Sequence, residues 1–388
     1  MDILTNKLSL DEFNEDFSEE LCKKFAEEYY TPGKAVVFRQ AFKNKFDNKK
    51  WDWEGMNAYF KAIKPNFHMR DIKDKTDYRL GKIVHNYVPM PADFIERYYY
   101  PSSPDYDKRH QYYVTVMNKG LIDQDDENNS LFEDLKNVMI TDNIVRGPAL
   151  WLGPKGHYEF NHSDAADNLI FMVTGKKRVR LFSNEHDNCL YYNLNQGYAI
   201  QSPVDLDDQE SINAHPKIKD APYYDIILDE GDMIYIPAFW AHQITSLTDS
   251  VSANYFMSFD QSKDEYWQRL TNERNFESFA RHLFVNLIGC GFKRRVTELL
   301  EKLDDNEELP ESVGKRNIVS AQELVKKYGS GKAVIDDQYA FDQELIKYHV
   351  IGAYRKTTPP LQGESITKDI NRIIDHWKNS KELSDAYS

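Results

Sequence analysis

A histidine and an aspartate stand two residues apart near the middle of the chain, at His162 and Asp164 in GHYEFNHSDAADN. On a β-strand, residues i and i+2 point to the same face, so both side chains can bind one metal ion side by side. Another histidine, His242, follows a proline turn in the downstream segment YIPAFWAHQI. Two histidines and one carboxylate form the facial triad that leaves positions on Fe(II) open for oxygen chemistry.

Taken alone, a His-x-Asp pair is a weak signal in a chain with 11 histidines and 63 acidic residues. A second match, 157–159 (HYE), begins five residues earlier, and an isolated pair is more often an ordinary pair of strand residues. The context of Asp164 separates the two matches. It is followed by Asn168, by the apolar run LIFMVTG and by a basic strand start at 176–178 (KKR), with His242 well downstream. This order favours a metal site over a chance pair.

The elements that position these residues are short and β-rich. Between about 140 and 258 the sequence contains the runs NLIFMVTG, KRVRLF, YDIILDEG, DMIYIPAF and SVSANYFM, separated by Gly, Pro, Asn and Asp. Many short strands with turns between them predict a β-sandwich or barrel. We expect 230–232 (EGD) to link two strands and Pro237 to end the second, as in a small barrel that folds back on itself.

The flanks differ from this middle part. Residues 15–30 predict an amphipathic helix with Leu21, Phe25 and Tyr29 on one face, followed by a strand in KAVVFRQAF and a helix at 54–63. The polar segment 101–135 is interpreted as a surface insertion. Beyond 262 the apolar spacing becomes helical, continues through 296–303 and returns at 366–384; the first apolar face contains Tyr266, Leu270, Phe276, Phe279, Leu283 and Leu287.

These patterns predict a mainly β fold with flanking helices, in which 1–139 supports a sandwich or barrel core at 140–262. The family resemblance described below implies that this core is a double-stranded β-helix (jelly-roll or cupin). Residues 263–388 are expected to form a C-terminal helical region; its segment 263–306 either packs on its own barrel or, as the family resemblance below implies, forms a homodimer. The 388 residues are 41% apolar, enough for a sizeable core. The three cysteines match no motif spacing, the chain does not start with a basic-then-apolar segment, and it has no apolar run of about 18 residues. These features predict a cytoplasmic or nuclear protein that is neither secreted nor membrane-bound.

The stretch from about 145 to 257 resembles the JmjC family of 2-oxoglutarate oxygenases. GPKGHYEFNHSDAADNLIFMVTGKKRVRLF is similar to that family's glycine turn, His-x-Asp, Asn and GKKRV segment. LDEGDMIYIPAFWAHQITSL and SVSANYF are similar to its second-histidine strand and the asparagine-bearing strand that follows. FAEEYYTPGKAVVFR resembles its usual N-terminus. The agreement runs in order over on the order of 110 residues, which is far more specific than one motif.

The resemblance implies that His162, Asp164 and His242 bind iron and act in catalysis, with 2-oxoglutarate as co-substrate and O2 as oxidant. It implies oxidative decarboxylation of 2-oxoglutarate coupled to hydroxylation of a substrate C–H bond. Because the aspartate is present, hydroxylation is expected rather than the halogenation of relatives that lack this ligand. The protein's part is positioning and exclusion of water.

The same resemblance implies roles for three further residues. Lys177 matches the lysine that pairs with the distal carboxylate of 2-oxoglutarate, a charge-assisted bond worth roughly 1.5–3 kcal/mol. Its neighbour Lys176 is expected to point the opposite way on the strand, into solvent. Asn168 and Asn254 match asparagines that line the metal and co-substrate site. Each of these asparagines could instead be a structural turn residue or a core amide.

One position departs from the family's pattern. Many of its hydroxylases have a threonine three residues before the first iron histidine, and that threonine also binds the 2-oxoglutarate carboxylate; here the position is Glu159. A carboxylate there repels another carboxylate. Either Glu159 faces away, or it binds substrate, or the clamp is built differently, with Tyr158 as a candidate hydroxyl helper.

The substrate class is less sharply defined than the metal site. Within the family the chain looks most like the small hydroxylases of the asparaginyl and tRNA wybutosine types, which also end in a dimer-forming helical segment. A net charge of −14 disfavours nucleic acid, although tRNA is not excluded because 293–295 (KRR) and 326–327 (KK) are locally basic. We therefore favour a protein, peptide or small amino-acid-like substrate. Lysine demethylation and a non-catalytic cupin scaffold also stay open, and no zinc-binding cysteine cluster supports a histone reader.

Overall fold

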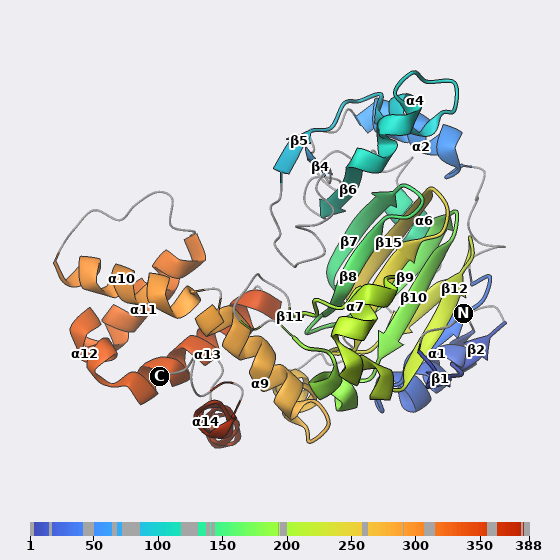
Figure 1. Ribbon diagram of the computed structural model, residues 1–388. Coiled ribbons are helices and arrows are strands. Elements are labelled where there is room, and N and C mark those ends of the chain that lie inside the picture. Colours follow the sequence, from blue (N-terminus) through green and yellow to red (C-terminus); the bar gives the residue numbers. More distant parts are fainter. Residues whose placement is uncertain are drawn as a thin grey trace. The chain divides into compact units, whose positions relative to one another are not determined.

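Figure 1 shows the computed structural model of the chain, which describes residues 4–14, 18–41, 50–63, 68–71, 86–117, 131–136, 140, 144–192, 194, 200–257, 263–289, 291–305, 315–354, 363–381 and 383. These residues form two compact units. Met1–Tyr192 and Gln201–Phe259 make up the first unit, and Asn193–Ile200 and Asp260–Ser388 make up the second. The predicted three-part division at 1–139, 140–262 and 263–388 stays a prediction.

Two sheets build the β-rich part of the chain (Figure 1). The smaller sheet has the strand order β1-β12-β10-β14-β8-β11. Its strands are β1 (Lys7–Leu8), β8 (Tyr158–Ser163), β10 (Lys177–Phe182), β11 (Ile200–Gln201), β12 (Tyr223–Leu228) and β14 (Ala241–Ser246). The central strands β12, β10, β14 and β8 pair antiparallel, as in a jelly-roll sheet.

The larger sheet has the order β2-β3-β13-β9-β15-β7-β6-β4-β5. Its strands are β2 (Glu12–Phe13), β3 (Val36–Phe38), β4 (His68–Asp71), β5 (Asn86–Pro89), β6 (Tyr112–Met117), β7 (Ile144–Gly153), β9 (Asp167–Thr174), β13 (Met233–Ile236) and β15 (Ser250–Met257). Each apolar run expected between 140 and 258 is a strand, and the turn at 230–232 joins β12 to β13 with Gly231 at φ +90°. The predicted mainly β, jelly-roll fold is confirmed.

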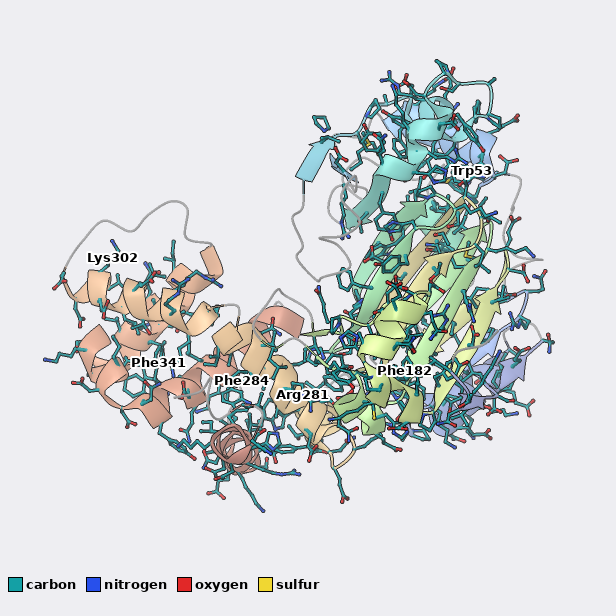
Figure 2. All side chains as sticks on the ribbon, viewed as in Figure 1. Trp53, Phe182, Arg281, Phe284, Lys302 and Phe341 are labelled. Atoms are coloured by element: carbon teal, nitrogen blue, oxygen red, sulfur yellow. The ribbon has the colours of Figure 1, made fainter. Side chains whose placement is uncertain are left out.

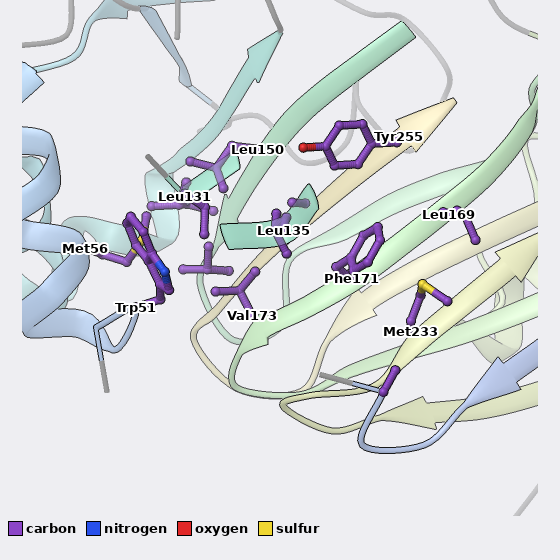
Figure 3. Close-up of a cluster of buried hydrophobic side chains, with 14 of the residues drawn as sticks. Trp51, Met56, Leu131, Leu135, Leu150, Leu169, Phe171, Val173, Met233 and Tyr255 are labelled. Carbon is purple, nitrogen blue, oxygen red and sulfur yellow. The ribbon is translucent and has the colours of Figure 1, made fainter. Parts of the chain in front are cut away.

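Strand β9 explains how the two sides of the larger sheet differ. All eight of its residues are buried, and successive side chains point to opposite faces. Leu169, Phe171 and Val173 belong to the outer cluster shown in Figure 3, with side chains such as Trp51. The alternate residues Ile170 and Met172 pack in the interior with side chains of the smaller sheet, among them Val179, Leu181 and Leu228. Asn168 lies two residues before Ile170 on β9 and points to the same face, so its amide is inside the barrel.

N-terminal helices cover the outer cluster. They are α1 (Glu19–Phe25), the π-helix η1 (Ala26–Tyr30), α2 (Trp53–Ile63), α4 (Phe94–Tyr99) and α6 (Leu131–Lys136). Leu21, Phe25 and Tyr29 are buried together, as predicted, in a helix whose N-cap is the hydroxyl of Ser18. Residues 15–17 of the predicted helix lie outside the described residues.

The interpretation of 101–135 as a surface insertion is wrong for 112–117 and for 131–135. Residues 112–117 form β6, which pairs with β4 on one side and β7 on the other, and Tyr113 and Val114 are almost fully buried. Leu131 and Leu135 of α6 are fully buried in the outer cluster. The run YYVTVM has the aromatic and β-branched composition of a strand, but the polar residues around it concealed that pattern. Residues 118–130, including the acidic stretch, lie outside the described residues.

Gly175 makes the turn between β9 and β10, two residues before Lys177, with φ +82°. A Cβ at this position would overlap the Asp249 carbonyl and lie 2.6 Å from Thr248 Oγ1. Gly175→Ala is therefore expected to lower the free energy of unfolding by about 3 kcal/mol, because left-handed backbone strain and steric overlap add. Chemical denaturation measures this loss.

Gly156→Ala is the matched control for that substitution. Gly156 also has a positive φ of +83°, but a Cβ there meets nothing within 4 Å. It is expected to lose only about 1 kcal/mol, from the backbone conformation alone. Equal losses in the two variants would show that the packing around the Gly175 turn is not tight.

The second unit is helical. Its helices are α8 (Lys263–Thr271), α9 (Phe276–Phe284), the π-helix η5 (Val285–Gly289), α10 (Phe292–Asp304), α11 (Lys315–Tyr328), α12 (Gly331–Asp336), α13 (Gln338–Tyr354) and α14 (Glu364–Asn379). The predicted C-terminal helical region is confirmed, and Phe284 and Phe341 are among its buried side chains (Figure 2). Trp377 Nε1 donates to the Ala280 carbonyl at 2.8 Å, which fixes α14 against α9. Of the described helices, none is both long and apolar enough to cross a bilayer.

Candidate metal and co-substrate site

The candidate site lies on the inner face of the smaller sheet, where three neighbouring strands place their side chains in rows. Strand β14 is central and pairs with β10 on one side and β8 on the other. The backbone N–H of Ser246 also donates to the His157 carbonyl at 2.8 Å, which extends the pairing past the end of β8. The three rows across β10, β14 and β8 are Leu181, His242 and His162; Val179, Ile244 and Glu159; and Lys177, Ser246 and His157.

A β-bulge in β8 brings Glu159 and His162 to the same face. The register with β14 shifts so that two residues, Phe160 and Asn161, lie opposite Gln243 alone. Residues three apart on a regular strand face opposite sides, and one extra residue reverses this. Both Glu159 and His162 therefore line one pocket, together with residues from both sheets: Tyr113, Trp151, His157, Asp164, Asn168, Ile170, Lys177, His242, Ile244, Ser246, Ser252, Asn254 and Phe256.

His162, Asp164 and His242 converge at one end of this pocket, and their ligand atoms all lie within 4.8 Å of one another. Asp164 Oδ2 is 3.9 Å from His162 Nε2 and 3.8 Å from His242 Nε2. Metal–nitrogen and metal–oxygen bonds are about 2.0–2.2 Å. Small side-chain movements therefore bring all three atoms onto one ion.

Both imidazoles present the correct nitrogen to this point. His162 Nδ1 lies 2.8 Å from the Phe160 carbonyl and His242 Nδ1 lies 3.1 Å from the Trp240 carbonyl. A carbonyl only accepts, so each Nδ1 carries the proton and each Nε2 keeps its lone pair. Burial, with the neighbouring His162, lowers the pKa of His242 to about 4. The His242 imidazole is thus neutral near pH 7.

The loop that carries Asp164 is fastened to the turn that precedes His242. Phe239, at a left-handed φ of +68°, donates its backbone N–H to the Asp164 carbonyl at 2.7 Å. Asp167 Oδ1 accepts from the Ala238 N–H at 3.1 Å and from the Tyr235 hydroxyl at 2.6 Å. These bonds explain how a carboxylate beyond the end of β8 is held beside two strand histidines.

The donor set fits a divalent transition metal. Two imidazoles and one carboxylate on one side of the ion are the ligands of non-haem Fe(II) oxygenase sites, which leave the opposite positions open. The ligands are also accessible from the pocket, because His162 and Asp164 are half-buried while His242 is buried. The three predicted iron ligands are brought together as the sequence suggested.

Lys177 lies at the other end of the pocket. The residue is 3% exposed, and its ammonium donates to Ser252 Oγ at 2.6 Å. Burial lowers the pKa of Lys177 to about 8, although the charge of Glu159 acts in the opposite direction. Lys176 points away and pairs with Asp229 on the surface at 2.5 Å, as predicted. A cation this poorly hydrated favours an anionic partner.

Asn168 and Asn254 both line the pocket and are linked in one chain of hydrogen bonds. Trp151 Nε1 donates to Asn254 Oδ1 at 2.7 Å, and Asn254 Nδ2 donates to Asn168 Oδ1 at 2.8 Å. An indole only donates, so the direction of both bonds is fixed. Asn168 therefore keeps its Nδ2 hydrogens for an acceptor in the pocket.

Glu159 does not face away from the pocket, which excludes one of the orientations considered for this residue. Its carboxylate is buried, lies 3.3 Å from Arg70 Nη1 and is 3.8 Å from His157 Nε2. The suggestion that Tyr158 assists Lys177 is wrong, since Tyr158 points off the pocket face and the hydroxyl bound to Lys177 belongs to Ser252. The physical reason is strand alternation: His157 and Glu159 line the pocket, so Tyr158 between them points to the opposite face.

Several pocket residues escaped the sequence analysis. Tyr113 was hidden in the segment interpreted as an insertion, and its ring stacks on His157 with centroids 3.8 Å apart. Ser252 stands two residues before Asn254 on β15, so strand alternation was a usable signal for it. Trp151 and, outside the pocket lining, the Glu159 partner Arg70 carry no local signal, because only sheet pairing between distant segments brings them to this region.

Comparisons with known proteins agree with this geometry. Lysine-specific demethylase JMJ30 of Arabidopsis thaliana is 36% identical over 108 residues, covering 28% of this chain and 25% of that protein. The tRNA wybutosine-synthesizing protein 5 of Danio rerio is 35% identical over 134 residues, covering 32% and 39%. JmjC domain-containing protein F of Dictyostelium discoideum is 30% identical over 194 residues, covering 42% and 40%. The chain therefore spans between a quarter and two fifths of the length of these relatives.

The family model described as a cupin-like domain matches residues 22–264, which is more than half of the chain. The match includes strands β3 to β15, the His-Asp-His cluster and Lys177. JmjC proteins recur among the relatives, in agreement with the motifs around His162 and His242. The chain belongs to the cupin-like domain family, in its JmjC-related branch.

Proposed function

We propose that the chain is an Fe(II)- and 2-oxoglutarate-dependent oxygenase that hydroxylates a C–H bond of a protein, peptide or amino-acid-like substrate. The observation that carries this proposal is the convergence of His162, Asp164 and His242 within 4.8 Å, with both Nε2 lone pairs available. Fe(II) bound there supplies a centre at which O2 and 2-oxoglutarate react. A scaffold that had lost catalysis has no need to retain all three ligands and their tautomers.

The residues of the pocket are suited to the co-substrate. Lys177 would hold its distal carboxylate, with Ser252 fixing the ammonium. The Nδ2 hydrogens of Asn168 would donate to an oxygen near the metal, an orientation set by Asn254. Apolar walls, formed by Ile170, Ile244 and Phe256, would exclude water during the reaction.

Charge favours a protein or peptide substrate over RNA. The net charge is −14, and two lysines of the locally basic segments are neutralised within the second unit. Lys293 lies 2.8 Å from the buried Asp342, and Lys327 lies 2.8 Å from the buried Glu344. Less positive charge therefore remains for phosphate contacts than the sequence suggests. The relatives are named for lysine demethylation and tRNA wybutosine synthesis, so methylated lysine and tRNA are the competing substrates.

Succinate release tests the proposal. The purified protein, with Fe(II), 2-oxoglutarate and O2, is expected to form succinate, and a peptide library should stimulate it and gain one oxygen atom by mass spectrometry. The His162→Ala variant is the control. No iron-dependent succinate above this control, with peptides or tRNA, would favour the scaffold. Stimulation by tRNA, with binding that weakens steeply as salt rises, would instead select the RNA substrate.

Trp151→Phe tests the hydrogen-bond chain through the asparagines. Loss of the indole donor allows both amides to rotate, and one neutral hydrogen bond is worth about 0.5–1.5 kcal/mol. The KM for 2-oxoglutarate is therefore expected to rise roughly 2–10-fold, with metal affinity unchanged. Trp53→Phe, at a tryptophan stacked on Tyr99 outside the pocket, should leave KM unchanged. An unchanged KM in Trp151→Phe as well would remove this role.

A further inference from the structure

Glu159 occupies the row between the metal ligands and Lys177. On β14, the residue paired with Glu159 is Ile244. The row on one side contains His242, and the row on the other side contains Ser246, which pairs with Lys177. Alternate residues on a strand are ~7 Å apart. A co-substrate that reaches from the metal to Lys177 must therefore pass alongside the Glu159 carboxylate.

Arg70 is the closest cation to that carboxylate. It belongs to β4 of the larger sheet and reaches across the interior, so that its Nη1 lies 3.3 Å from Glu159 Oε1. The two side chains are 16% and 11% exposed, which protects the pair from solvent screening. Tyr113, paired with Arg70 in register, places its ring 5.6 Å from the Arg70 guanidinium carbon.

Repulsion by Glu159 would strongly weaken the binding of a dianion. A carboxylate that has no cation partner and lies ~7 Å from a negative charge of the ligand, at an effective dielectric constant of about 20, lowers the affinity for that ligand by roughly 50-fold. Burial acts to raise the pKa of Glu159, but the Arg70 charge and the hydrogen bond with His157 outweigh it and lower the pKa to about 2. Glu159 is thus an anion at neutral pH, and Arg70 is the cation that forms an ion pair with it.

We infer that Arg70 determines the co-substrate preference of this pocket, by neutralising Glu159 so that a dicarboxylate can bind between the metal triad and Lys177. The inference rests on the proposed function. It assigns Arg70 a positioning and specificity role through Glu159, without contact to the co-substrate. It also resolves the departure at Glu159, because a carboxylate at this position is compatible with a dianion only as half of an ion pair.

A double-mutant cycle tests this assignment. Binding of 2-oxoglutarate is measured without O2, with Mn(II) in place of Fe(II), in the full-length protein. Arg70→Met is expected to weaken binding about 10–50-fold, because it removes the cation that forms an ion pair with Glu159. Glu159→Gln should bind at least as tightly as the wild type, and the double variant should return to within about threefold of it. The same comparison with Arg70→Gln replaces Arg70→Met if the latter does not fold.

The monocarboxylate 2-oxopentanoate is the second probe. It lacks the distal carboxylate, so Arg70→Met should change its affinity less than about threefold, and the preference for 2-oxoglutarate should fall. The inference would be overturned if Arg70→Met weakened the binding of both ligands equally, or if the double variant bound 2-oxoglutarate as weakly as Arg70→Met. Either result indicates a structural role for Arg70. A wild type that binds Mn(II) but no 2-oxoglutarate would overturn the proposed function itself, whereas normal wild-type binding with no effect of Arg70→Met overturns the inference alone.

Discussion

His242→Ala is expected to reduce iron-dependent turnover of 2-oxoglutarate by more than about 100-fold. Loss of residues that merely support a metal ligand already costs about 10–100-fold, and His242 supplies one of the three ligand atoms directly. The substitution also removes the imidazole opposite His162, whose ring centroid is 4.4 Å away. Succinate formation at saturating 2-oxoglutarate measures the effect.

The control for this substitution is His186→Ala. His186 lies in the 3₁₀-helix η3 (Asn184–Cys189), outside the pocket. Both variants should keep the circular dichroism spectrum of the wild type, and only His242→Ala should lose activity. Turnover retained by His242→Ala within about tenfold of the wild type would place the reaction elsewhere.

Lys177→Met is expected to raise the KM for 2-oxoglutarate by about 10–150-fold, because a charge-assisted bond of about 1.5–3 kcal/mol is lost. The thioether chain fills the space of the lysine stem, so the buried position stays packed. A small effect would indicate that the distal carboxylate binds another group. Loss of turnover with an unchanged KM would likewise assign Lys177 a role other than carboxylate binding.

The pH dependence of that KM provides a second readout on Lys177. Burial lowers the pKa of Lys177 to about 8, so the ammonium is charged below that pH and loses its proton above it. A bound carboxylate favours the charged form. The KM of the wild type is therefore expected to rise as pH increases through about 8, and this rise should be absent in Lys177→Met. A wild-type KM that stays flat up to pH 9 would contradict the carboxylate role.

The His-Asp-His cluster was predictable from the order of its motifs and from the family resemblance that they carry. His162 and Asp164 share a short segment, and His242 follows a recognisable strand and proline turn. Strand alternation also predicted the opposite directions of Lys176 and Lys177. The jelly-roll fold followed for the same reason, since each short apolar run between 140 and 258 forms a strand.

The direction of Glu159 was not predictable from spacing. It depends on a bulge that places Phe160 and Asn161 opposite Gln243, and no local pattern in YEFNHS indicates that bulge. Arg70 was missed for a different reason. It lies 89 positions before Glu159 and reaches it only because β4, β6 and β7 pair at one edge of the larger sheet. Long-range pairing of this kind leaves no periodic signal in the sequence.

Metal titration tests the central claim most directly. Calorimetry with Mn(II) in the absence of O2 is predicted to give one bound ion per chain in the wild type, and binding should be lost or weakened at least about 100-fold in each of His162→Ala, Asp164→Ala and His242→Ala. Full-strength binding of one ion in all three variants, or none in the wild type, would contradict a single site built from these three side chains.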